Sequence, residues 1–182
     1  MLNRLIPLRK FAGISLLLVI YWLLALWMNS HVPLFEAPDA YYHFGVIEYR
    51  ARTGQFPPYD HPTDHPWRQM TFHAPFYYEI SAGLIRILNI DTSDFEVKYP
   101  PNPHAATGDT SSHGNDNFVA YSVTSSADLW QQTGLAVHVV RLLSITLGML
   151  TLIGIYTIAR QVIPKRKDAA LIAVAMVAFN PQ

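Results

Sequence analysis

An uncharged apolar run near the start constrains this chain most: FAGISLLLVIYWLLALWM, at Phe11–Met28. A helix needs roughly 17–25 apolar residues to cross a bilayer, and this run meets that requirement. Basic residues precede it: Arg4, Arg9 and Lys10. A cleaved signal peptide is the alternative, but its apolar core has only about 7–15 residues and ends at a small-residue cleavage site. We therefore predict a retained transmembrane helix at 11–29 and a cytoplasmic basic tail at 1–10.

A second uncharged run of spanning length lies at Leu142–Ala159, and its helical pattern extends back to Gly134. We predict the second transmembrane helix at 134–159. A basic turn follows at 160–168, and such clusters prefer the cytoplasmic side of a membrane. The two basic ends thus predict one topology, in which both lie in the cytoplasm and residues 30–133 are extracytoplasmic.

The composition favours an integral membrane protein, which we place in the plasma membrane. Of its 182 residues, 51% are hydrophobic and only 14% are charged, whereas about a quarter is charged in soluble domains. The net charge of zero argues against nucleic-acid binding. The chain has no cysteine, which excludes disulfides and thiolate metal sites. The fold class we predict is all-α, with a long extracytoplasmic loop that carries surface-lying juxtamembrane helices.

A third apolar run, at 169–182, ends with AFNPQ and is too short to cross a bilayer. We predict the start of a third transmembrane helix there and expect the chain to be a truncated fragment.

The long loop begins with a predicted helix near 40–53. Pro38 and Asp39 precede its first turn, so that Asp39 is a candidate N-cap, and Gly54 follows its last turn as a candidate C-terminal glycine. If Asp39 does cap the helix, that role alone explains its presence.

A second loop helix is predicted near 74–88, where apolar residues recur at helical spacing. The segment is too short to span a bilayer. Two alternatives remain open: the helix lies on the membrane surface, or it packs against other parts of the protein. Residues 89–133 are rich in Asp, Ser, Thr, Asn, Gly and Pro and are predicted to be a long loop.

Acidic and histidine side chains gather at the start of the first loop helix. Asp39 and His43 are four residues apart and share a helix face, and Glu36 comes just before them. A carboxylate at a membrane surface can act as a general base toward an acceptor hydroxyl. With a histidine it can also bind a divalent metal, so a metal cofactor is possible. The alternatives are a helix cap for Asp39 and an ordinary interfacial polar role for His43.

Arg141 is placed where the second span meets the outer interface. Its guanidinium is suited to a phosphate group, and the alternative is that it reaches the lipid headgroups. His138, one turn earlier, is open to either role. The loop histidines match no compact metal site and are predicted to be mostly solvated: His61, His65, His73, His104 and His113. His73 is the exception, because it directly precedes the second loop helix.

Three motifs, in this order, resemble the amino-terminal part of the C-type-fold membrane glycosyltransferases, the group that contains protein O-mannosyltransferases. The first is PDAYYHF at 38–44, followed by GQFP at 54–57. The second is APFYY at 74–78, and the third is RLLSITLG at 141–148 with NPQ at 180–182. The sequence departs from the family pattern at Ala40, where many relatives have a second acidic residue, and this argues against a paired-carboxylate metal site.

The resemblance implies an integral-membrane inverting glycosyltransferase that takes a sugar from a polyprenyl-phosphate donor. It makes Asp39 the catalytic base toward an acceptor hydroxyl. It implies that a cation, such as Arg141 or a metal, meets the charge of the leaving phosphate, and we assign Glu36, His43, His73 and Arg141 to substrate binding. The expected partners are the lipid bilayer and the lipid-linked sugar. Because the family has many more spans, we expect this fragment alone to be inactive.

Two further functions remain open. The chain is alternatively a small non-enzymatic membrane protein that serves as a scaffold or interaction partner through its loop. The other alternative is a transporter fragment, although transporters usually have helices broken near the bilayer midplane.

Overall fold

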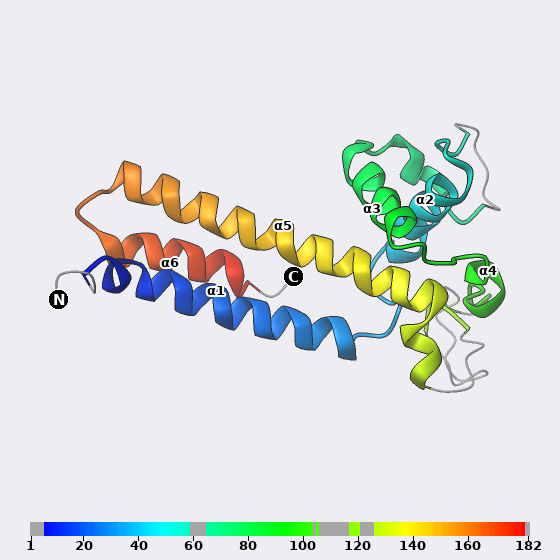
Figure 1. Cartoon of the computed structure of the whole chain (residues 1–182), viewed down its shortest axis with the longest axis horizontal. Coiled ribbons are helices and arrows are strands. Elements are labelled where there is room, and N and C mark those ends of the chain that lie inside the picture. The colour runs from blue at the N-terminus through cyan, green and yellow to red at the C-terminus, as the bar shows by residue number, and fades with distance from the viewer. Residues whose placement is uncertain (1–5, 59–64, 104, 106–116, 121–125, 181–182) are drawn as a thin grey trace. The chain divides into compact units, whose positions relative to one another are not determined.

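The computed structural model describes residues 6–58, 65–103, 105, 117–120 and 126–180, and these form helices joined by turns and loops (Figure 1). In chain order the helices are α1 (Ile6–His31), α2 (Ala40–Thr53), η2 (Arg68–Phe72), α3 (Phe76–Ile87), α4 (Phe95–Lys98), η3 (Ser126–Trp130), α5 (Gln132–Val162) and α6 (Lys167–Ala178). The chain divides into two compact units. We call residues 1–31 and 142–182 the three-helix unit and residues 32–141 the loop unit.

The three-helix unit contains the two predicted spans. The segments Phe11–His31 and Gln132–Val162 are long and apolar enough to cross a membrane, although α5 begins within the loop unit. Only 6% of each apolar stretch is buried, whereas the core helix of a soluble protein is mostly buried. We therefore treat the unit as membrane-associated, with α6 in contact with α1 (Figure 1). A small core holds the helices together: Ile14, Leu152 and Val174.

The loop unit is organised around α2, which coincides with the helix that the sequence predicts at 40–53. Its residues from Tyr41 to Glu48 are buried almost without interruption, so α2 is the central helix of the unit. It ends at Gly54, whose φ of 75° is the left-handed conformation that glycine adopts at low cost. The C-terminal glycine prediction is confirmed.

The helix α3 packs along α2. An ion pair of 2.8 Å joins Arg50 to Glu79, and the side chain of Arg86 donates to the carbonyl of Ala51 at 2.9 Å. The buried face of α3 includes Tyr78, Ala82 and Ile85. The packed alternative is therefore confirmed for this face.

The outer face of α3 keeps the membrane-surface alternative open. The side chains of Phe76 and Ile87 are 72% and 82% exposed. They lie three helical turns apart, on one face. That this face rests on a membrane surface stays a prediction. The helix starts later than the predicted 74–88 because Pro75 occupies its N-cap position.

Residues 89–133 contain more than the predicted loop. Within the described residues, this segment forms α4 and η3, and it sends Phe95, Tyr99 and Val119 into the core. At the centre of that core is Phe35, which is 1% exposed. Its ring centroid lies 5.3–5.6 Å from those of four aromatic neighbours: Tyr41, Phe44, Phe95 and Tyr99. The loop prediction is wrong for this part, since isolated aromatic residues complete a cluster built by distant segments.

Candidate functional site

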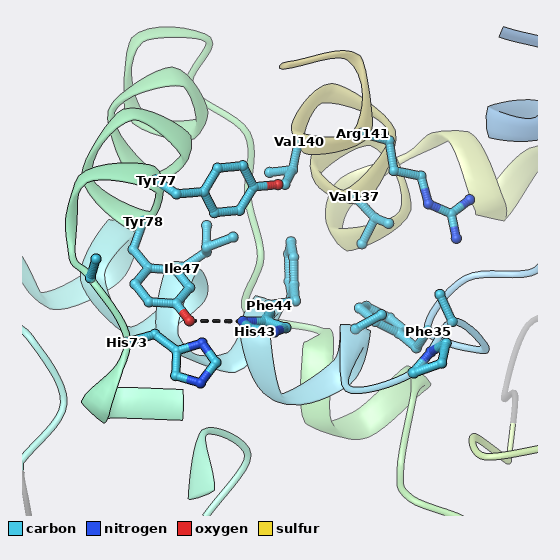
Figure 2. Close-up of a pocket in the computed structure, with 14 residues that line it drawn as sticks. Phe35, His43, Phe44, Ile47, His73, Tyr77, Tyr78, Val137, Val140 and Arg141 are labelled. Atoms are coloured by element: carbon cyan, nitrogen blue, oxygen red, sulfur yellow. Dashed lines mark hydrogen bonds between the residues drawn. The ribbon is translucent and has the colours of Figure 1, made fainter. Parts of the chain in front are cut away.

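A cavity of about 510 Å³ lies within the loop unit, and three of the predicted site residues line it (Figure 2). Its walls come from the segment before α2, from α2 and α3, and from the first turns of α5. Most of the lining side chains are apolar or aromatic, and the larger ones are Phe35, Phe44, Ile47, Tyr77, Val137 and Val140. Ligand sites commonly have about 300–1,000 Å³, mostly apolar walls and a few polar groups. The cavity therefore has the size and lining of a binding site.

The polar groups stand at two ends of this cavity. Figure 2 shows His43 and His73 together at one end and Arg141 at the other. The two imidazole rings are 5.2 Å apart between centroids. An elongated ligand with an apolar body would contact both ends.

His43 is oriented by a chain of hydrogen bonds. Its Nδ1 lies 2.7 Å from the hydroxyl of Tyr78, and that hydroxyl donates to the carbonyl of Met70 at 3.3 Å. Which of the two groups donates in the 2.7 Å hydrogen bond depends on the tautomer of His43. Burial raises the pKa of Tyr78 to about 12, which keeps its hydroxyl protonated at physiological pH.

The pKa of His43 is lowered from its ordinary value of 6.5. Burial is the largest cause, the positive form of His73 adds to it, and Asp39 opposes it. Because the folded state disfavours the proton, the unfolded chain binds more protons as the pH falls. The stabilisation that depends on neutral His43 is therefore fully present above about pH 6.5. It is lost as the pH falls below 6.5 and then through the lower pKa that His43 has in the folded state.

We expect the acid-side loss of loop-unit stability to be smaller in His43→Gln than in the wild type. Resistance of the loop unit to proteolysis, measured from pH 7.5 to pH 5, reports this difference. Tyr78→Phe is the matched control, since it removes the hydroxyl but keeps the ring that buries His43, and most of the pH dependence should remain. Identical profiles for His43→Gln and the wild type would contradict the burial account.

Asp39 occupies the N-cap position of α2 but does not cap the helix with its side chain. Its backbone is left-handed, with φ 58° and ψ 2°, and no side-chain cap hydrogen bond forms. The capping prediction is therefore wrong in its chemistry, because a capping side chain requires an extended backbone at this position. The residue is exposed, and its neighbours Pro38 and Ala40 line the cavity.

Glu36 has a structural contact rather than a place on the cavity wall. Its carboxylate accepts the backbone N–H of Phe118 at 2.8 Å and that of Val119 at 3.3 Å. These two hydrogen bonds connect the segment before α2 to a short stretch that is distant in the sequence. The carboxylate lies outside the cavity lining, so the prediction that Glu36 binds substrate gains no support from the geometry.

Arg141 lines the cavity and also supports the chain around it. Its guanidinium donates to the carbonyls of Val32 and Pro33, both at 2.8 Å. These bonds fix the segment that follows α1 against α5. They are an alternative to the headgroup contacts that the sequence left open for Arg141.

The remaining histidines do not join this site in the described structure. His65 stacks on Trp67, and His138 is buried against Trp130 at 3.7 Å between ring centroids. Histidines 61, 104 and 113 lie outside the described residues. Among the described residues, no group of three or more His, Asp or Glu side chains is arranged to hold a metal ion.

Tyr77 and Tyr78 are site residues that the sequence reasoning did not select. They belong to the APFYY motif, and the helical spacing placed only Tyr77 on the apolar face of the predicted helix. Comparisons with protein-family models, curated proteins and solved structures find no match to this chain. The resemblance to C-type-fold glycosyltransferases therefore stays a prediction that rests on the three motifs.

Proposed function

We propose that this chain is the amino-terminal part of an integral-membrane inverting glycosyltransferase. The enzyme would move a sugar from a polyprenyl-phosphate donor to an acceptor hydroxyl on the extracytoplasmic side of the plasma membrane. The observation that carries the proposal is the environment of the Asp39 side chain. Its carboxylate is exposed, caps no helix, and stands between two residues that line an apolar cavity.

The backbone of Asp39 supports a functional role. A left-handed conformation is costly for residues other than glycine, although Asp and Asn tolerate it better than most. Such strain persists where the surroundings impose it, and it gathers at functional sites. A helix cap would have explained the residue, and the structure leaves it without that role. Of the two functional uses that the sequence allows for Asp39, general base and metal ligand, we assign it the role of general base.

The cavity suits an isoprenoid phosphate. Its apolar and aromatic walls would bury the first part of a polyprenyl chain, which is hydrocarbon. Arg141 at one end carries a guanidinium, whose geometry fits a phosphate and which also donates to the carbonyls of Val32 and Pro33.

The proposed reaction is a single displacement. Asp39 takes the proton of the acceptor hydroxyl while the acceptor oxygen attacks the anomeric carbon of the sugar. The bond between that carbon and the phosphate oxygen breaks, and the configuration at the carbon inverts. The polyprenyl phosphate leaves, and Arg141 stabilises its added negative charge.

Photo-crosslinking tests the proposal. The probe is farnesyl phosphate with a diazirine on its first isoprene unit, applied to membranes that contain the protein. We expect adducts on peptides that include Phe44 and Tyr77, because both line the cavity. Unlabelled farnesyl phosphate should compete and farnesol should not, since only the former has the phosphate. The scaffold alternative predicts adducts without such competition.

A further inference from the structure

A second cavity, of about 590 Å³, lies within the three-helix unit. Apolar side chains of α1 and α5 form one part of its wall, including Phe11, Ile14, Leu18 and Ile153. Cations from the ends of α5 and α6, Arg160 and Lys167, form another part. The cavity is therefore amphipathic, with hydrocarbon walls along the helices and positive charge where they meet the predicted basic turn.

Among the residues that the structure describes, no acidic side chain forms an ion pair with Arg160 or Lys167. Asp168 is the acidic residue of the stretch 160–168, and Arg166 holds it in an ion pair of 2.8 Å. Arg160 is fixed in place because its Nη1 donates to the carbonyl of Pro164 at 2.9 Å. Lys165 lies in the same stretch but does not line the cavity.

We propose that this cavity binds one anionic phospholipid. An acyl chain lies along Ile14, Leu18 and Ile153, and the phosphate meets Arg160 and Lys167. Basic pockets between membrane helices are suited to anionic headgroups, and each nearby cation strengthens that attraction. A free phosphate would leave the apolar wall uncovered, whereas a lipid covers the wall and pairs the cations. Another apolar helix in this place would bury two cations without a counter-charge, which is costly.

Native mass spectrometry of the detergent-purified protein tests the site. The probes are phosphatidylglycerol and phosphatidylcholine with identical acyl chains, added in equal amounts. We expect the wild type to bind phosphatidylglycerol at least about tenfold more tightly, given two cations near the headgroup. The double variant Arg160→Gln/Lys167→Gln should lose this preference. Lys165→Gln makes the same kind of charge change outside the cavity and should keep it.

A second variant tests the cavity rather than the charge. Thr157→Trp leaves every cation in place and fills the space beside Arg160, so it should reduce phosphatidylglycerol binding. Unfolding is checked by gel filtration of each variant. Equal binding of the two lipids by the wild type would overturn the proposal, as would an unchanged preference in the double variant. A crosslinked protein helix in the cavity of the native membrane would also overturn it.

Discussion

In the complete protein of which this chain would be the amino-terminal part, replacing Asp39 by asparagine is expected to lower sugar transfer by about 10²–10⁴-fold, the usual contribution of a general base. Asparagine has nearly the same shape and also tolerates the left-handed backbone of this position. Its amide cannot accept the proton of the acceptor hydroxyl. The protein should therefore reach the membrane in normal amount and fail at the chemical step.

Asp39→Gly separates the catalytic role from a structural one. Glycine relieves the strain at φ 58°, so the loop unit should gain up to about 1 kcal/mol while transfer is lost. If Asp39 were a helix cap, Asp39→Gly would instead lower the stability of the loop unit slightly. The measurements are transfer from a radiolabelled polyprenyl-phosphate sugar and thermal resistance to protease.

The control for both variants is Asp91→Asn. Asp91 is an exposed carboxylate of the same unit that accepts the N–H of Ser93 and does not line the cavity. Transfer should be unchanged in this variant. Full activity of Asp39→Asn would rule out Asp39 as the base.

Gly45→Ala is expected to destabilise the loop unit by about 1–3 kcal/mol or more. A Cβ at Gly45 would collide with the backbone carbonyl of Pro66. The carbonyl carbon of Pro66 would lie only 2.6 Å from this Cβ. The backbone of Pro66 cannot move aside as the end of a flexible side chain can. The α2 helix would have to move away from the segment that leads into η2, and the cavity wall would move with it.

The matched control is Gly83→Ala, in the middle of α3. A Cβ there has no neighbour within 4 Å, and alanine favours the helix over glycine by about 0.5–1 kcal/mol. It should therefore stabilise the unit. Protease resistance of the loop unit over a temperature series gives both values. Equal midpoints for Gly45→Ala and the wild type would contradict the close approach of α2 to Pro66.

The apolar helices and α2 were predictable because their signals are local. Uncharged runs of spanning length define α1 and α5, and Gly54 marks where α2 ends. The prediction for the start of α2 was wrong in one respect, the capping role of Asp39. The residue type and position of Asp39 are those of a cap, but its backbone conformation depends on how the preceding segment, with Phe35 buried in the core, enters the helix.

The rest of the site depends on contacts between distant segments. Glu36 binds the backbone of residues 118 and 119, and Arg141 binds that of residues 32 and 33. No spacing within one segment indicates such pairs. The same reason explains why Phe95 and Tyr99 were assigned to a loop: their neighbours in the core come from elsewhere in the chain.

The map of farnesyl phosphate adducts tests the central claim most directly, because it asks whether a lipid phosphate occupies the cavity beside Asp39. The account predicts adducts on α2 and α3 that disappear with excess farnesyl phosphate and persist with farnesol. Adducts confined to the three-helix unit, or equal competition by farnesol, would contradict it.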